Sequence, residues 1–223
     1  MIRTWTLTAL LAFGLSTPAM AQEVLGDWVG TVKTPGAELT ITMHVEPGPG
    51  GTLQGVAGSP DQTPTPLPMS DIVMKGDSLT FAVPVVGGSF KGTWDPVGKR
   101  WNGAMTQQGF EMPMSLGHGK VGARPTVAGL DGDWQGVLQV PQGDLRIVLK
   151  VKTDANGTLA MFSSPDQGPG EMAAAVTHDG DAVSFQLKGM GGFDGKMSAD
   201  GKTLDGYWRQ GGNSLPLTMK KGG

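Results

Sequence analysis

The chain carries two divergent copies of one segment, and this internal duplication constrains the fold more than any other feature. Leu25 to Gly117 forms the first copy and Asp131 to Gly222 the second. Short motifs recur in the same order in both copies. They are Gly-Asp-Trp-x-Gly at 26–30 and 132–136, Ser-Pro-Asp-Gln at 59–62 and 164–167, and Met-Pro-Met at 112–114 against Leu-Pro-Leu at 215–217. Each copy therefore specifies the same small structural unit.

Strict alternation of apolar and polar residues follows the tryptophan of that first motif. The apolar row Leu145, Ile147, Leu149 and Val151 has the counterpart Leu39, Ile41, Met43 and Val45 in the first copy. A period of two indicates a strand with one buried face. Further short alternating rows follow, separated by turn sequences such as Asn156-Gly157, which favours a tight hairpin. We count about eight such strands per copy, a spacing typical of an all-β barrel or sandwich.

Sequential hairpins favour an antiparallel up-and-down meander, and closing the meander into a barrel removes its exposed edge strands. We therefore predict an all-β fold of two tandem up-and-down β-barrels, at residues 22–117 and 130–223. Residues 118–129 contain Gly and Pro without alternation and are interpreted as a linker. The alternative is a single larger barrel built from both copies. The strands are shorter than the roughly 9–11 residues of a membrane strand, so we expect no membrane span.

Residues 1–21 have the three parts of a secretory signal peptide. Arg3 is followed by the apolar run Leu7 to Leu15 and by Ala19-Met20-Ala21, a small-x-small cleavage site. The apolar run is shorter than the roughly 20 residues of a membrane helix. The alternative is a genuine N-terminal helix. We expect cleavage before Gln22 and a periplasmic or secreted protein.

Composition excludes several classes of function. The chain has no cysteine, which excludes disulfides, zinc–thiolate sites, a cysteine nucleophile and a lipid-anchoring cysteine. The net charge is −3, with 17 Lys and Arg scattered among 20 Asp and Glu. A nucleic-acid partner would need a basic stripe, and an anionic membrane surface would need a basic cluster. We expect neither partner.

The motifs resemble those of known barrels. Gly-x-Trp at the start of a strand, followed by an antiparallel meander, resembles the opening of lipocalin and streptavidin-like barrels. The longer pattern of the second copy, from Gly-Asp-Trp to Leu-Pro-Leu, resembles a module that precedes an α/β-hydrolase or related serine-hydrolase domain in bacterial exported proteins. The first copy departs from it, with Thr63 in place of Gly168 and Met105 in place of Trp208. Because no hydrolase domain follows in this sequence, the resemblance implies an accessory or binding barrel.

The Ser-Pro-Asp-Gln loop has two interpretations. Proline presets a turn, and an aspartate carboxylate bonds local backbone amides, so the loop could be purely structural. Alternatively it supplies polar groups at a barrel mouth, where small barrels bind ligands. The candidate ligand-binding residues on the second interpretation are Asp166, Gln167 and Gln210, with Asp61, Gln62 and Gln107 in the first copy.

Trp208 is the remaining candidate for ligand binding. It lies in the same row as Leu204 and Gly206, so its side chain should point inward, as core or as the floor of a ligand site. Trp28 and Trp134 are expected to plug one barrel end. The inward-facing glycines, Gly103 and Gly206 among them, either permit a sharp bend or leave room for a ligand.

A catalytic set cannot be assembled from the sequence. We interpret His44, His118 and His178 as exposed, because none pairs with another at ligand spacing. Gly76-Asp77-Ser78-Leu79 matches the motif for which one esterase family is named. Those enzymes place the serine near the start of an α/β fold, whereas here it follows a hairpin turn. The other copy has Ala182 in place of the serine. A motif without its structural context is weak evidence, so we expect no enzyme and no cofactor.

Thioether ligands suit copper(I), and Met112 and Met114 lie near His118. The corresponding residues of the second copy are Leu215 and Leu217, so the two positions require apolar bulk rather than sulfur. Methionine fills core gaps well. We expect no metal site.

Two hypotheses for function follow. The first is a binding module for a small, mostly apolar ligand. The second is an accessory module with filled barrels that docks on another exported protein, such as a hydrolase. If only one copy binds, we expect it to be the second, because it keeps Trp208 and the full Ser-Pro-Asp-Gln-Gly loop.

Overall fold

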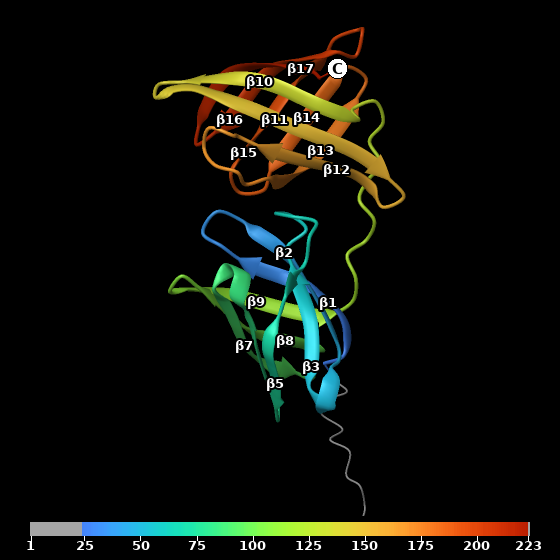
Figure 1. Cartoon of the computed structure of the whole chain (residues 1–223), viewed down its shortest axis with the longest axis vertical. Helices are drawn as coiled ribbons and strands as arrows, with labels where there is room; N and C mark the ends of the chain where they lie inside the picture. Colours follow the sequence, from blue (N-terminus) through green and yellow to red (C-terminus); the bar gives the residue numbers. More distant parts are fainter. Residues whose placement is uncertain (1–23, 223) are drawn as a thin grey trace, which may run out of the picture.

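The computed structural model describes residues 24–222, and the expected signal peptide lies outside this range. Two antiparallel β-sheets, one from each copy, are stacked along the long axis of the molecule (Figure 1). The strands of each copy pair only among themselves within the described residues, which confirms two barrels and excludes the single larger one.

Barrel 1 is a nine-stranded sheet in the order β4-β3-β2-β1-β9-β8-β7-β6-β5. Its strands are β1 (Gly26–Lys33), β2 (Glu38–Pro47), β3 (Leu53–Gly58), β4 (Leu67–Pro68), β5 (Ser70–Lys75), β6 (Ser78–Val83), β7 (Gly88–Asp95), β8 (Arg100–Gln107) and β9 (Phe110–His118), with the 3-10 turns η2 (Pro49–Gly51) and η3 (Pro84–Val86).

Barrel 1 has nine strands instead of eight because one strand is interrupted. β4 and β5 together occupy the place of a single strand, and Met69 between them donates its backbone N–H to Gly55 O (2.9 Å). Asp71 has a positive φ of 52°, and the pairing of β5 with β6 shifts between Ser70 and Val73. These irregularities leave the barrel nearly closed.

Barrel 2 is a closed barrel of eight strands in sequence order. β10 pairs with β17 through Trp134 to Gly136, which closes the ring. The strands are β10 (Gly132–Val140), β11 (Gly143–Asp154), β12 (Gly157–Ser163), β13 (Met172–Asp179), β14 (Ala182–Leu187), β15 (Gly191–Met197), β16 (Thr203–Gln210) and β17 (Asn213–Lys221).

The first tryptophan of each copy anchors the end of its barrel where the first strand begins. Trp28 and Trp134 are almost fully buried. Each indole Nε1–H donates to a carbonyl four residues earlier, that of Val24 or of Leu130, at 2.8 Å. Because the segment before each first strand is thereby fixed over the core, any open space must lie at the opposite end of the barrel.

The inward-facing glycines bring neighbouring strands together. A Cβ atom on Gly206 would collide with the backbone of Asp194 and Gly195, and one on Gly103 would collide with Lys91 and Gly92. Neighbouring backbone therefore fills the space that a side chain would occupy at these two positions. The glycines at these positions therefore allow two strands to approach closely, and they do not leave room for a ligand.

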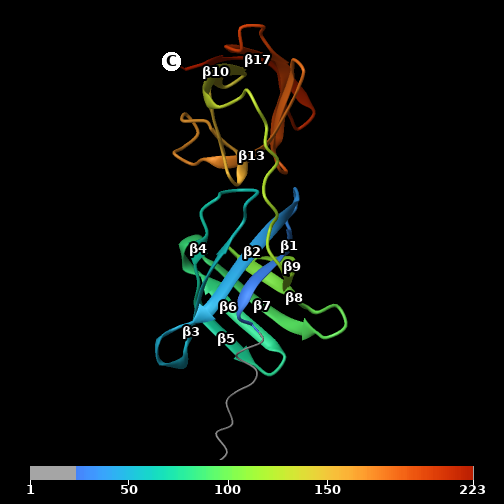
Figure 2. The same ribbon diagram turned by 90° about the vertical axis from the view of Figure 1, so that its right-hand side faces the viewer.

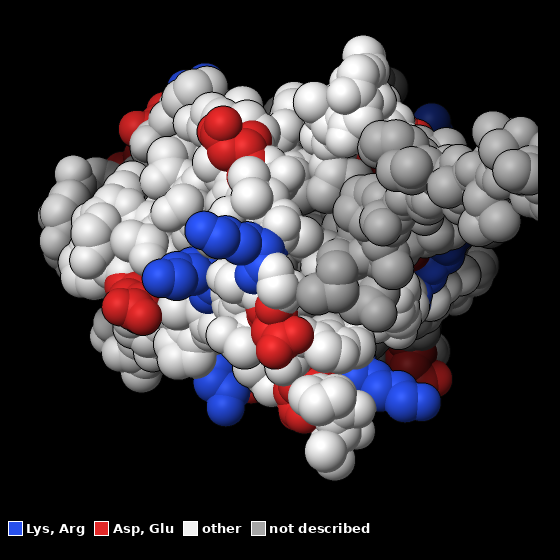
Figure 3. Space-filling view, turned by 90° about the horizontal axis from the view of Figure 1, so that it is seen from below, with Lys and Arg blue, Asp and Glu red and all other residues white. Residues whose placement is uncertain are grey.

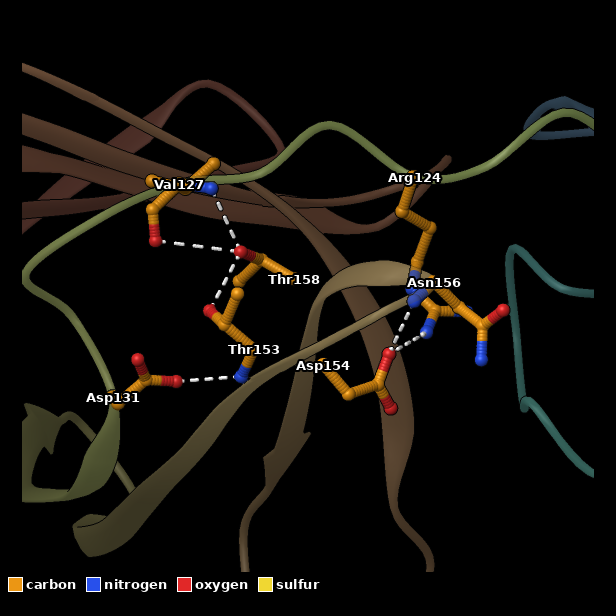
Figure 4. Close-up of polar contacts among 7 residues, drawn as sticks. All are labelled: Arg124, Val127, Asp131, Thr153, Asp154, Asn156 and Thr158. Atoms are coloured by element: carbon orange, nitrogen blue, oxygen red, sulfur yellow. Dashed lines mark hydrogen bonds and ion pairs between the residues drawn. The ribbon is translucent and has the colours of Figure 1, made fainter.

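The connection between the barrels is held along the β11–β12 hairpin (Figure 4). His118 ends β9 and stacks on Trp28 with ring centroids 3.7 Å apart, so the connection begins after it. Thr158 Oγ1 accepts the Val127 N–H (2.8 Å), and Asp131 accepts the Thr153 N–H (2.6 Å). The connecting segment is thus part of the surface of barrel 2 (Figure 2).

Two polar contacts join the barrels directly. The backbone N–H of Ala173 in β13 donates to Gln62 O (2.8 Å), and Lys188 Nζ lies 2.8 Å from Asp61 Oδ2. On the far side of barrel 1, acidic and basic side chains lie interspersed among uncharged residues (Figure 3). Among the described residues, the charged contact between the barrels is thus the single pair Lys188–Asp61.

Candidate ligand-binding cavities

A cavity of about 500 Å³ opens at the end of barrel 2 opposite Trp134. We call it the barrel 2 cavity, and its volume is in the range of about 300–1,000 Å³ typical of small-molecule sites. Its walls are mostly apolar. They are formed by Leu138, Val140, Pro141, Leu145, Ile147, Phe162, Met172, Leu187, Met190, Trp208 and Leu215.

An aromatic stack forms the floor of the barrel 2 cavity. Phe162 and Trp208 lie with ring centroids 5.1 Å apart and planes 17° apart, and Phe185 packs against both from the core. Phe185 does not line the cavity. Trp208 is only 5% exposed yet lines the open space, because its position in β16 points inward. Trp208 therefore serves both as core and as floor.

Four side-chain amides supply the polar part of the lining: Gln142, Gln167, Gln210 and Asn213. Gln210 accepts the indole N–H of Trp208 through its Oε1 (3.0 Å), which links the rim to the floor. Amides both donate and accept hydrogen bonds, and they carry no charge. This lining suits a ligand with an apolar body and an uncharged hydrogen-bonding group.

Asp166 does not line the cavity, although the sequence places it in the same loop as Gln167. Its carboxylate accepts the backbone N–H of Arg146 (2.7 Å) and pairs with the guanidinium of the same residue (2.7 Å). The side-chain hydrogen bond from Arg146 lowers the pKa of the Asp166 carboxyl below its ordinary value. Asp166 therefore fixes the loop to β11, and this anchoring leaves Gln167 at the cavity.

Barrel 1 contains a smaller cavity of about 210 Å³, which we call the barrel 1 cavity. Gln62 and Gln107 both line it, and Gln107 Nε2 donates to Val86 O (3.0 Å). Ser59 also lines it; this hydroxyl is buried, and it has no hydrogen-bond partner among residues 24–222. Phe81 forms part of the wall, so this narrower cavity reaches deeper into its barrel.

Asp61 has the same anchoring role as Asp166 but a different cationic partner. It accepts the backbone N–H of Thr40 and pairs with Lys188 of barrel 2. Burial raises the pKa of Asp61, but the hydrogen bonds from Lys188 and Thr40 outweigh burial, and the pKa lies below its ordinary value. Asp61 is thus a residue of the contact between the barrels.

A third hollow of about 320 Å³ lies between the barrels, and we call it the inter-barrel crevice. Its walls combine the β1–β2 turn and the Ser-Pro-Asp-Gln loop of barrel 1 with the start of β13 and the β14–β15 turn of barrel 2. Sequence reasoning missed this hollow. Nothing in two separate repeats indicates how their ends face one another.

The histidines considered from the sequence lie apart from the cavities, whereas the two methionines considered with them do not. His44 pairs with Asp27 (2.8 Å) on the surface, and His178 Nδ1 contacts Ala128 O (2.7 Å). Met112 and Met114 line the barrel 1 cavity, whereas His118 stacks on Trp28 away from it. Within residues 24–222, no three His, Asp or Glu side chains are grouped to hold a metal ion. Over the same range, no helix has the length and apolar character to cross a membrane.

Comparison with known proteins gives remote similarities only. No protein-family model matches the chain, and no curated protein matches it. One similar structure is a protein of unknown function from the DUF3598 family of Nostoc punctiforme PCC 73102, with 13% identity, a TM-score of 0.26, and coverage of 90% of this chain and 97% of that chain. Another is a candidate outer membrane protein of Bacteroides fragilis NCTC 9343, with 11% identity, a TM-score of 0.31, and coverage of 91% and 99%. The function is therefore inferred from the cavities themselves.

Proposed function

We propose that the protein is an exported, non-catalytic binding protein that holds a small, mostly apolar and uncharged ligand in the barrel 2 cavity. The observation that carries this proposal is a cavity of about 500 Å³ with apolar walls and an aromatic floor. Burial of apolar surface supplies roughly 25 cal/mol per Å², and the neutral amides at the rim orient the ligand without charge.

The chemistry of the lining supports binding rather than catalysis. The side chains that line the barrel 2 cavity are apolar or carry neutral amides. General acid–base catalysis requires a group that exchanges a proton near the operating pH, and amides do not. Trp208 Nε1–H is already satisfied by Gln210, so the floor presents mainly its aromatic face.

Fluorescence titration with N-phenyl-1-naphthylamine, an uncharged apolar probe, tests the proposal. We expect saturable 1:1 binding with a Kd of about 1–100 µM, a range reasonable for a probe of this size. The sulfonated analogue 1-anilinonaphthalene-8-sulfonate should bind at least about tenfold more weakly, because the lining of the cavity has no cation to pair with its charge.

Two variants locate the probe. Leu215→Trp adds bulk to the wall of the barrel 2 cavity without removing core, and it should abolish probe binding. Tyr207→Ala is the matched control, because Tyr207 is half exposed on the outer face of the same sheet. Saturable binding that survives Leu215→Trp, or an absence of binding to the unmodified protein, would overturn the proposal.

A second candidate function is docking on another exported protein. It is favoured by Val85 and Phe110, which are each 69% exposed in the turn η3 and at the start of β9. Large exposed apolar side chains can contribute to an interaction surface. A protein that fails to bind the probe, and that loses association with a partner on Phe110→Ser, would favour this second function.

A further inference from the structure

The barrel 2 cavity, the inter-barrel crevice and the barrel 1 cavity share walls. The inter-barrel crevice shares Met172, Leu187 and Met190 with the barrel 2 cavity. It shares Thr34, Leu39 and Gln62 with the barrel 1 cavity. The three hollows therefore adjoin one another in a row, which forms a path from barrel 2 through the crevice to barrel 1.

Polarity changes along this path in a regular way. Both ends are apolar: Phe162 and Trp208 form the floor in barrel 2, and Phe81 lies deep in barrel 1. Between these ends, the crevice adds the polar side chains of Thr34, Asp61, Gln62 and Lys188 to its apolar walls. A ligand that matches the whole path has two apolar arms joined by a polar centre.

The charged residues of the crevice favour a ligand whose central polar group is uncharged. Asp61 and Lys188 are its two charged residues, and they pair with each other at 2.8 Å. A charged group placed there would lose its hydration without gaining a free counter-charge. The buried hydroxyl of Ser59, which has no hydrogen-bond partner among the described residues, lines the barrel 1 cavity and can bond an ester or hydroxyl oxygen.

We propose that the two barrels together bind one two-armed, lipid-like molecule, with an apolar arm in each barrel and an uncharged polar centre, such as a glycerol diester, in the crevice. This inference rests on the proposed function and extends the site to barrel 1. The cavity volumes of about 500 and 210 Å³ imply arms of unequal bulk, with the slimmer one in barrel 1.

Close contacts between the barrels hold the two walls of the crevice together. Gly189 has a φ of 78°, and a Cβ atom there would lie 2.7 Å from Ala37 Cβ, so the two turns approach as closely as glycine permits. The Ala173–Gln62 hydrogen bond lies on the same side of the interface. A ligand that bridges the crevice would therefore bind without any change in the relative position of the two barrels.

Native mass spectrometry of the full chain with 1,2-dioctanoylglycerol and with 1-monooctanoylglycerol tests the inference. We expect one dioctanoylglycerol per chain, bound at least about tenfold more tightly than the single-chain probe, because the second arm binds at a high effective concentration. We expect the single-chain probe to occupy barrel 2 first.

Ala57→Phe provides the decisive variant. Ala57 lines the barrel 1 cavity, and it corresponds to Phe162 of barrel 2 in the strand pairing. The fold of barrel 2 therefore already accommodates a phenylalanine at this position. We expect Ala57→Phe to reduce the affinity for dioctanoylglycerol about tenfold, to that of monooctanoylglycerol for the unmodified protein. The affinity for monooctanoylglycerol, which binds in barrel 2, should stay unchanged. Met105→Trp is a second way to fill the same cavity if Ala57→Phe fails to fold.

The outcomes separate this inference from the proposed function. Equal affinities for the two glycerides, two dioctanoylglycerol molecules per chain, or no effect of either filling variant would overturn the two-armed ligand while leaving the barrel 2 site intact. Failure of both glycerides and of the naphthylamine probe to bind would overturn the proposed function as well.

Discussion

The two barrels share one fold and differ at a few inward positions, and these positions decide the shape of each interior. Both keep a stacked pair of phenylalanines with ring centroids 5.0 Å apart, Phe81 with Phe90 and Phe185 with Phe193.

The difference lies next to this pair. In barrel 2, Phe162 and Trp208 stack on each other. Barrel 1 has Ala57 and Met105 at the corresponding strand pairings.

The loss of two aromatic rings gives barrel 1 a deeper but smaller cavity. Phe81 lines that cavity, whereas its counterpart Phe185 lies below the floor in barrel 2. The smaller side chains are compensated by flexible methionines, which fill irregular space. The comparison shows that two copies of one barrel can differ in the shape of the interior while their strands follow the same sequential order.

The Ser-Pro-Asp-Gln loops show a second divergence. Asp166 finds both its backbone donor and its cation in Arg146 of its own barrel. The counterpart of Arg146 is Thr40, which supplies only the backbone donor to Asp61, and the cation comes from Lys188 of the other barrel. The same loop carboxylate is thus an internal anchor in barrel 2 and a contact between the barrels in barrel 1.

The largest expected effect contrasts Trp208 with Met105. Trp208→Ala should abolish binding of N-phenyl-1-naphthylamine because it removes the floor of the barrel 2 cavity. Met105→Ala should change the affinity less than about twofold and lower only the stability of barrel 1. Fluorescence titration measures both, with circular dichroism to check folding. Equal loss from the two variants would contradict the asymmetry between the barrels.

Substitutions at the second aromatic position should affect the stability of the two barrels to very different extents. Phe162→Ala removes a buried ring from a stack and should lower the free energy of unfolding by about 3–5 kcal/mol. Ala57→Phe fills existing space and should lower it by less than about 1.5 kcal/mol, or raise it. Urea denaturation gives both values. A large destabilisation by Ala57→Phe would mean that the barrel 1 cavity is smaller than the structure shows.

The ion pair between the barrels should contribute less. The side chains of Lys188 and Asp61 are 44% and 25% exposed, and such partly exposed pairs contribute about 0.2–1 kcal/mol. Lys188→Ala should loosen the contact slightly, and raising the salt concentration should have the same effect on the unmodified protein. Small-angle X-ray scattering reports the separation of the barrels. A Lys188→Ala protein with unchanged scattering at low and high salt would show that backbone contacts alone hold the barrels.

Acidification should loosen the same contact. The pKa of Asp61 is lower in the folded protein, so its contribution is fully present above the unfolded pKa of about 3.9. That contribution is lost as the pH falls through the lowered folded pKa. Scattering should therefore stay constant from pH 7 to pH 5 and change only below about pH 4. A change between pH 7 and pH 5 would assign the contact to another group.

Much of the fold was predictable because period-two patterns report burial directly. The rows containing Leu39 and Leu145 lie in β2 and β11 with the expected faces buried, and each copy forms its own barrel. The break between β4 and β5 was not predicted. Pro66 and Pro68 lie around it, and proline removes the backbone N–H that a continuous ladder needs.

The candidate site was predictable only in part. The alternation of inward and outward side chains along the strand predicted the position of Trp208. The Ser-Pro-Asp-Gln loop predicted that Gln167 lies near a barrel mouth, and both predictions depend only on the local direction of the chain. The roles of Asp61 and Asp166 depend on which cation folds against each carboxylate, and the crevice depends on how the barrels dock. Such contacts between distant residues leave no periodic signal in a single sequence.

The most direct test of the barrel 2 site follows the indole N–H signals in ¹H–¹⁵N spectra during titration with N-phenyl-1-naphthylamine. Trp208→Phe assigns the signal of Trp208, whose N–H lies at the rim beside Gln210. We expect the Trp208 signal to shift and saturate, while those of Trp28 and Trp134 at the other ends of the barrels stay in place. A Trp208 signal that does not move at saturating probe, or equal shifts of all three, would contradict a ligand site in barrel 2.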